Sequence, residues 1–131
     1  MGLGFNQVFN NYFMKDFKKL KIWQKGMDIV TETYKLSNSL PRYEKFGLVS
    51  QITRAAVSIP TNIAEGSSRS STNDYKRFLE YALGSAFELE TLLLSIRNSE
   101  IDTKNISDEK LMDLIIEEQK MLTSFLHTLP S

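Results

Sequence analysis

Residues 51–71, QITRAAVSIPTNIAEGSSRSS, constrain the fold of this chain more than any other stretch. Apolar side chains recur there at alternating steps of three and four, which places them on one face of an α-helix: Val49, Ile52, Ala56, Ile59 and Ile63. Pro60 lacks a backbone donor and predicts a kink within the helix. Gly66 predicts a left-handed C-cap. The small side chains of Ala55 and Ser58 predict a close approach by a neighbouring helix, which is typical of a tightly packed bundle.

The same spacing predicts three further helices and their apolar faces. The helix of residues 20–39 has the core stripe Leu20, Trp23, Met27, Val30 and Tyr34. The next begins near Thr72, after a capping box formed by Ser71 and Asp74, and its core stripe is Tyr75, Phe78, Ala82, Ser85, Leu89, Leu92 and Ile96. The last is capped by Ser107 and buries Leu111, Leu114, Ile115, Leu122, Phe125 and Leu129. Short connections predict an all-α, antiparallel up-down-up-down four-helix bundle.

Two of these helices carry a second apolar face that a single bundle does not cover. On the helix of residues 20–39 this face is formed by Ile22, Ile29 and Leu36. On the helix that begins near Thr72 it is formed by Leu83, Phe87 and Leu94. A helix that is apolar on two faces is normally buried on both, so we expect these residues to form the interface of a homo-oligomer. The alternative is that they are single exposed apolar residues, which are common on protein surfaces.

Glu118 interrupts the apolar face of the last helix. An unpaired charge in a core is costly, so we expect the helix to be rotated slightly and Glu118 to lie at the rim. The alternative is an inward carboxylate that pairs with Arg54 or Arg97.

Composition limits the class of protein. The chain has 131 residues and no cysteine, so it contains neither a disulfide nor a thiolate metal site. The length suits one domain, which we place at residues 14–131, with residues 1–13 as a poorly ordered extension; Met1 and Met14 both fit the native start. No run of about 18 apolar residues predicts a membrane span, and the first residues do not resemble a signal peptide. We therefore expect a cytoplasmic protein.

The formal net charge is zero, but the charges are unevenly distributed. Residues 1–45 carry eight basic and four acidic side chains, whereas residues 81–131 carry four and nine. One interpretation is a surface that contacts nucleic acid, formed by Lys15, Lys18, Lys19, Lys21, Lys25 and Arg69. The other is complementary contact between helices of opposite charge. Trp23 lies among these lysines, but its place on the core stripe favours packing over base stacking.

The motifs for catalysis are missing. A serine-rich turn precedes a predicted helix start and is a candidate phosphate site, although such turns cap helices more often: Ser67, Ser68, Arg69 and Ser70. The single histidine, His127, lies at the end of the last helix, where a cation is favourable. No P-loop, nucleophile elbow or pair of Glu-x-x-His motifs occurs. The sequence predicts a protein that is not an enzyme and binds no metal or cofactor.

Three segments carry a resemblance to a known family: FKKLKIWQKGMDIV, LPRYEKFGLVSQITRAAVSIPTNIAEGSSRSS and YKRFLEYALGSAFELETLL. Over residues 14–127 the chain resembles the bacterial 23S ribosomal RNA intervening-sequence proteins, also called the S23-type four-helix-bundle family. Lys19 and Gly26 depart from the family pattern, which commonly has an acidic residue and an alanine there.

The resemblance implies a bundle that assembles into a ring, with a pentamer as the expected form. The family is also distantly similar to the accessory protein of diversity-generating retroelements, which implies nucleic acid or a reverse transcriptase-like protein as a partner. The family's pattern residues imply structural roles for Arg54, Pro60, Asn62, Glu65, Gly66 and Glu88. Among these, we expect Arg54 to pair with Glu65 or Glu88, within a subunit or between subunits.

We therefore predict a non-enzymatic, oligomeric helical bundle that binds nucleic acid, specifically RNA, through a basic surface. The alternative is a structural or protein-interaction scaffold without nucleic-acid contact. The sequence defines neither the partner nor the number of subunits.

Overall fold

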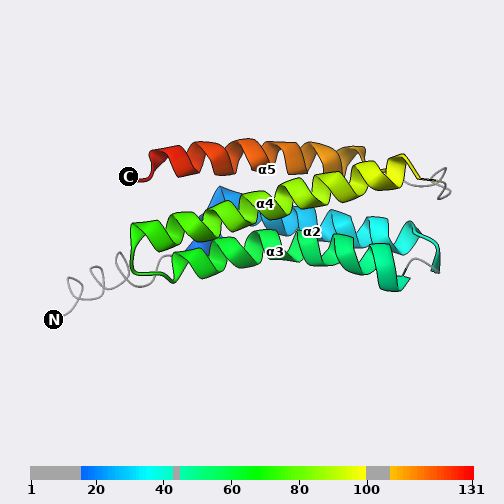
Figure 1. Cartoon of the computed structure of the whole chain (residues 1–131), viewed down its shortest axis with the longest axis horizontal. Coiled ribbons are helices and arrows are strands. Elements are labelled where there is room, and N and C mark those ends of the chain that lie inside the picture. The colour runs from blue at the N-terminus through cyan, green and yellow to red at the C-terminus, as the bar shows by residue number, and fades with distance from the viewer. Residues whose placement is uncertain (1–15, 43–44, 100–106) are drawn as a thin grey trace.

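The computed structural model describes residues 16–42, 45–99 and 107–131. These residues contain four α-helices: α2 (Lys21–Ser39), α3 (Ser50–Ser67), α4 (Thr72–Arg97) and α5 (Glu109–Thr128). A 3-10 turn, η1 (Phe17–Lys19), precedes α2, and a π-helical turn, η3 (Lys45–Val49), leads into α3. The described part of the chain has no strand, and it forms an all-helical bundle (Figure 1).

Each helix packs against two others. α3 contacts α2 and α4, and α5 contacts α4 and α2, so the face made by α2 and α3 lies opposite the face made by α4 and α5. Two ion pairs join α2 to α5: Lys25 contacts Glu117, and Glu32, further along α2, contacts Lys110, which comes earlier in α5. These two helices therefore run in opposite directions along the bundle (Figure 1).

The apolar face predicted for α3 is confirmed. Ile52, Ala56, Ile59 and Ile63 are completely buried. Pro60 is also buried and lies within the helix, which continues to Ser67. This helix is central to the bundle because its inward face is formed by branched and small apolar side chains along its whole length.

The prediction that Gly66 is a left-handed C-cap is wrong. Gly66 is buried inside α3, and the helix ends one residue later with Ser68 as its C-cap. A Cβ atom on Gly66 would lie 2.9 Å from Cβ of Phe78 and 3.0 Å from Cδ1 of Tyr75. Glycine is therefore required there because α4 passes too close for any side chain.

The two apolar stripes of α2 are exchanged relative to the prediction. Ile22, Ile29 and Leu36, predicted to face outward, lie in the core of the bundle, together with Gly26 and Thr33. These three side chains are buried against the chain's own helices, so the prediction that they form an outward interface is wrong. The reason is that Gly26 and Thr33 do not look apolar in the sequence, although Gly26 permits close packing and the Thr33 hydroxyl donates to the Ile29 carbonyl at 2.7 Å.

The predicted core stripe of α2 instead lies at the surface. Met27 and Tyr34 are 41% and 51% exposed, whereas Leu20, Trp23 and Val30 are partly buried at the edge of the core.

In α4 the start is predicted correctly and the buried face is slightly rotated. Ser71 is the N-cap, and its side chain accepts a hydrogen bond from the backbone N–H of Asp74 at 3.1 Å. The buried residues are Tyr75, Leu79, Ala82, Ala86, Leu89, Leu93 and Ile96. Phe78, Ser85 and Leu92, predicted in the core, are only partly buried. Of the predicted second face, Phe87 and Leu94 are exposed and Leu83 packs partly against the core.

The cap predicted for the last helix is wrong. α5 begins at Glu109 with Asp108 as its N-cap residue, and Ser107 lies outside the helix. The Asp108 carboxylate makes no capping bond because it accepts two hydrogen bonds, 2.9 Å and 2.8 Å long, from the Arg97 guanidinium at the end of α4. Leu111, Ile115 and Leu122 are buried as predicted, and Leu114, Phe125 and Leu129 are partly buried. Within the described residues, no helix is long and apolar enough to cross a membrane.

The close contact at Gly66 yields a prediction about stability. Replacing Gly66 with Ala should lower the free energy of unfolding by about 1–3 kcal/mol, because the new methyl group pushes α3 away from α4. Gly84→Ala is the matched control, since a Cβ atom there has no neighbour within 4 Å. This control should raise the free energy of unfolding by about 0.5–1 kcal/mol through helix propensity. Urea unfolding measures both, and equal effects of the two substitutions would contradict the contact.

Candidate functional site

Glu118 lies at the centre of the bundle, where α2, α3 and α5 meet. Its side chain is completely buried, and neither carboxyl oxygen has a hydrogen-bond partner among the described residues. A Cβ atom on Gly26 would lie 3.2 Å from Oε2 of Glu118 and 3.3 Å from Cβ of Pro60. The carboxyl group therefore packs closely against Gly26, beside Pro60.

The prediction that Glu118 lies at the rim is wrong. Neither alternative partner reaches it: Arg97 binds Asp108, and Arg54 is exposed. Burial raises the pKa of Glu118 to about 8, and the nearby charge of Lys25 offsets only part of this increase. Glu118 is therefore mostly protonated at neutral pH, and the bundle avoids the cost of a buried charge.

Lys25 forms an ion pair with Glu117, the residue before Glu118 in α5. Its Nζ atom lies 2.6 Å from Oε2 of the exposed Glu117, and this hydrogen bond lowers the pKa of Glu117. Two adjacent glutamates on α5 thus differ in charge, because Glu117 faces solvent and a lysine whereas Glu118 faces the core. Lys25, predicted to contact nucleic acid, is half-buried and already has this partner. Since solvent does not reach Glu118, the group holds a proton in the core and offers no access to a substrate.

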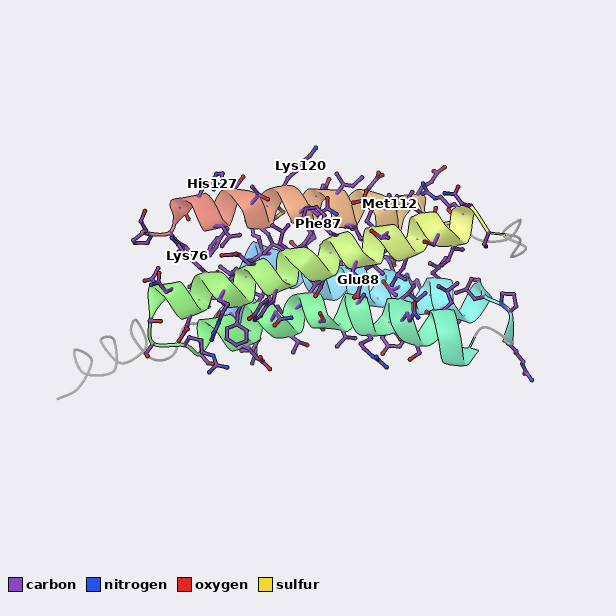
Figure 2. The ribbon with its side chains drawn as sticks, in the orientation of Figure 1. Lys76, Phe87, Glu88, Met112, Lys120 and His127 are labelled. Atoms are coloured by element: carbon purple, nitrogen blue, oxygen red, sulfur yellow. The ribbon has the colours of Figure 1, made fainter. Side chains whose placement is uncertain are left out.

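Basic side chains gather at one end of the bundle. Figure 1 shows that the start of α2, the turn between α3 and α4, and the end of α5 lie together there. We call this surface the basic end and define it by Lys18, Lys19, Lys21, Arg69, Lys76, Arg77 and Lys120. Figure 2 shows Lys76 near this end, at the start of α4, and Lys120 closer to the middle of α5. Lys120 joins this surface through the groove that it shares with Lys19 and Lys21. Lys15, also predicted to contact nucleic acid, lies outside the described residues.

Some charges of the basic end are paired and others are not. Arg77 lies 3.3 Å from the carboxylate of Asp74, and Lys19 lies 4.0 Å from that of Asp16. Within the described part of the chain, Lys21 and Lys120 form no ion pair. Lys120 could not be anticipated, because it belongs to the acidic half of the sequence and joins the other lysines only when α5 packs beside α2.

In the predicted phosphate turn, three of the four side chains already have partners within the protein. Ser67 is buried and donates to the Ile63 carbonyl at 3.1 Å, and Ser68 donates to the Glu65 carbonyl at 2.7 Å. The guanidinium of Arg69 stacks 4.4 Å above the ring of Phe78. Ser70 is exposed beside them. The serine hydroxyls therefore satisfy the carbonyls at the end of α3, and the turn serves mainly to end one helix before the next begins.

Two strips of apolar side chains lie on opposite outer faces. The α2 strip comprises Trp23, Met27, Val30 and Tyr34. It lies on the α3 side of α2, because Lys25 and Glu32 contact α5 on the other side. The α4 strip comprises Leu83, Phe87 and Leu94.

Glu90 locates the α4 strip relative to α5. It shares the helical spacing of the α4 strip and accepts a hydrogen bond from Gln119 of α5 at 2.8 Å, so this strip borders α5. Figure 2 shows Phe87 at the boundary between α4 and α5. One strip therefore lies on the face made by α2 and α3, and the other on the face made by α4 and α5.

The remaining pattern residues have structural surroundings. Pro60 is buried, and the side-chain amide of Asn62 donates to the Ser58 carbonyl at 2.8 Å. The Ser58 hydroxyl contacts that of Ser85 between α3 and α4. Arg54, Glu65 and Glu88 are exposed, and none of the ion pairs among the described residues includes them, so the expected pairing within a subunit is absent there.

A groove opens at the basic end, between the start of α2 and the last turns of α5. Its volume is about 500 Å³. The floor is apolar and is formed by Leu20, Ile22, Met121 and Phe125. Three lysines line it as well: Lys19, Lys21 and Lys120. This groove cannot be predicted from the sequence, because its two sides come from opposite ends of the chain.

These features define a class: a small all-helical bundle with a closed core, a basic end and two apolar outer strips. Residues 18–124 match the model of the 23S rRNA-intervening sequence protein family, and the chain belongs to that family. A solved structure from Bacteroides thetaiotaomicron, a protein of unknown function from the S23 ribosomal protein family, is 28% identical and superposes with a TM-score of 0.69. The match covers 82% of this chain and 99% of that one. No curated protein sequence matches the chain.

The buried carboxyl group predicts how stability depends on pH. Glu118 titrates near 4.5 in the unfolded chain and near 8 in the folded one, so between these values only the folded state retains the proton. The free energy of unfolding should therefore fall as the pH rises from about 4.5 to about 8, and this contribution should be constant outside that window. One pKa unit corresponds to about 1.4 kcal/mol, so the change amounts to a few kcal/mol.

Glu118→Gln is the matched variant, because it keeps the shape of the side chain and removes the titrating proton. Urea unfolding of both proteins over a pH series measures the difference between them, from which contributions of other carboxylates such as Glu117 cancel. The variant should gain stability relative to the wild type across the window. Parallel curves would show that Glu118 does not titrate with a raised pKa.

Proposed function

We propose that this protein is a non-enzymatic building block that assembles with copies of itself into a ring and presents its basic ends to RNA. The observation that carries the proposal is the position of the two apolar strips on opposite faces of the bundle. Exposed apolar surface of this kind marks interaction sites. When one patch of a subunit binds a different patch of the next, the contact is heterologous, and it closes into a ring if the rotation between subunits permits.

The strips suit such a contact. Tyr34 and Met27 on one face, and Phe87 and Leu94 on the other, are the most exposed large apolar side chains of the strips, each at least 41% exposed. Aromatic residues and methionine are enriched at protein interfaces, where they supply large contact areas. The resemblance to the S23-type family makes a pentamer the expected ring. The exposed strips support the choice of the two contact faces, whereas the number of five subunits rests on the family resemblance.

RNA is the proposed partner of the assembled ring. A neutral chain attracts a polyanion only if its positive charge is concentrated, and the basic end concentrates lysines and arginines from three parts of the sequence. Repetition around a ring would multiply this surface. The family description, which refers to an intervening sequence in 23S rRNA, supports a connection with RNA.

The second candidate is a protein-interaction scaffold that contacts no nucleic acid. The apolar strips favour it, because they fit a different polypeptide as well as a second copy. A reverse transcriptase-like protein is the partner that the distant similarity to the retroelement accessory protein implies.

Opposite-strip variants test the assembly. Phe87→Asp and Tyr34→Asp should each dissociate the oligomer, because each places a charge in one side of every interface. When the two variants are mixed, each still has one intact strip, so they should form a pair that grows no further. Tyr81→Asp is the control, since Tyr81 is as exposed as Phe87 but lies on neither strip. Light scattering after size-exclusion chromatography measures the masses, and a monomeric wild type would refute the assembly.

Charge reversal tests RNA binding. Lys18→Glu with Lys21→Glu should weaken binding of a short single-stranded RNA about tenfold or more and reduce the dependence of affinity on salt, because fewer phosphate contacts release counterions. Lys110→Glu, at the opposite end of the bundle, should leave both unchanged. Fluorescence anisotropy at several salt concentrations measures the affinity. Binding that is insensitive to salt and to the lysine pair would favour the scaffold.

A further inference from the structure

The groove at the basic end has the composition of a ligand site. Small-molecule sites typically occupy about 300–1,000 Å³, and this groove has a volume of about 500 Å³. Its floor presents apolar side chains from both sides, among them Phe125, whose ring packs against that of Tyr75 with their centroids 6.0 Å apart. The floor is therefore held by the core behind it and presents a stable apolar surface.

Three of the five polar residues that line the groove are lysines, and the other two are Ser124 and Thr128. Lys19, Lys21 and Lys120 are exposed, and no acidic side chain lines the groove. Thr128 also lines it, but its hydroxyl already donates to the Phe125 carbonyl at 2.6 Å. A ligand in the groove would therefore contact apolar side chains on the floor and lysine side chains at the rim. It would meet few other groups able to form hydrogen bonds with it.

We propose that this groove binds a free single-chain anionic amphiphile, a long-chain carboxylate in the simplest case, with the alkyl chain on the floor and the carboxylate among the lysines. The inference goes beyond the proposed function and does not depend on it. A carboxylate among lysines matches the charge, and an alkyl chain matches the floor.

Other occupants match less well. A nucleobase needs hydrogen-bond partners along its edges, and the groove supplies few. Residues 1–13 precede the groove in the chain, but they contain no acidic residue that could pair with Lys21 or Lys120. The apolar strips available on a second copy lie on two other faces of the bundle.

Calorimetric titration of the full chain with dodecanoate, below its micelle concentration, tests the proposal. We expect saturable binding of one dodecanoate per chain. Decanoate should bind about tenfold more weakly, because two methylene groups are lost. Dodecyltrimethylammonium has the same chain and the opposite charge and should not bind. Equal binding of the two head groups would overturn the proposal, because it would mean adsorption to apolar surface only.

Two variants locate the site. Lys21→Glu with Lys120→Glu should weaken dodecanoate binding at least tenfold, whereas Lys110→Glu, an exposed lysine of α5 at the other end of the bundle, should not change it. Ser124→Phe adds a ring at an exposed position of the groove, so it should block the site without loss of charge or stability. Thermal unfolding confirms that each variant is folded. Unchanged binding by the folded Ser124→Phe variant would overturn the assignment.

Two further outcomes would also overturn it. Binding to anionic phospholipid vesicles without binding of monomeric dodecanoate would mean that the groove contacts a membrane surface. Binding of dodecanoate by the Phe87→Asp variant but not by the wild type would mean that a second copy occupies the groove.

Discussion

The orientation of α2 is tied to the packing of one buried carboxyl group against a glycine and a proline. Glu118 lies in the core beside Gly26, where a Cβ atom would be 3.2 Å from its carboxyl oxygen, and Pro60 borders the same space from α3. With Gly26 and Thr33 facing inward, α2 must also turn Ile22, Ile29 and Leu36 inward, since all five share one helical face. The stripe of Trp23, Met27, Val30 and Tyr34 is consequently left at the surface. The α2 strip is therefore exposed because the opposite face of α2, with Gly26 and Thr33, is the one that packs in the core.

This dependence explains where sequence reasoning succeeds. The face of α3 could be predicted because branched apolar side chains repeat along it without interruption, and the start of α4 could be predicted because Ser71 and Asp74 form a local motif. For α2 both stripes are plausible by periodicity, and a glycine and a threonine decide between them through contacts with other helices. The role of Gly66 is hard to predict for a similar reason: a nearby helix, and not the local backbone, requires glycine there.

The candidate surfaces were less predictable than the fold. A rule that buried charges are avoided placed Glu118 at the rim, and it failed because burial itself removes the charge by raising the pKa. The lysines at the start of α2 could be identified as exposed, but Lys120 and the groove depend on α5 returning beside them. A chain without net charge acquires a basic end only through folding. Function that depends on such a surface is therefore encoded in topology as much as in composition.

The paired hydrogen bonds between Arg97 and Asp108 have a consequence for how this fold tolerates change. They join the last residue of α4 to the residue before α5, so the register of these two helices is set without the intervening chain. Lengthening a loop whose ends are already held costs little, about 0.6 kcal/mol for each doubling. A position between Arg97 and Asp108 is accordingly a natural place for an inserted peptide, such as an epitope or a fluorophore-binding tag, because the two helix ends stay joined on either side of it.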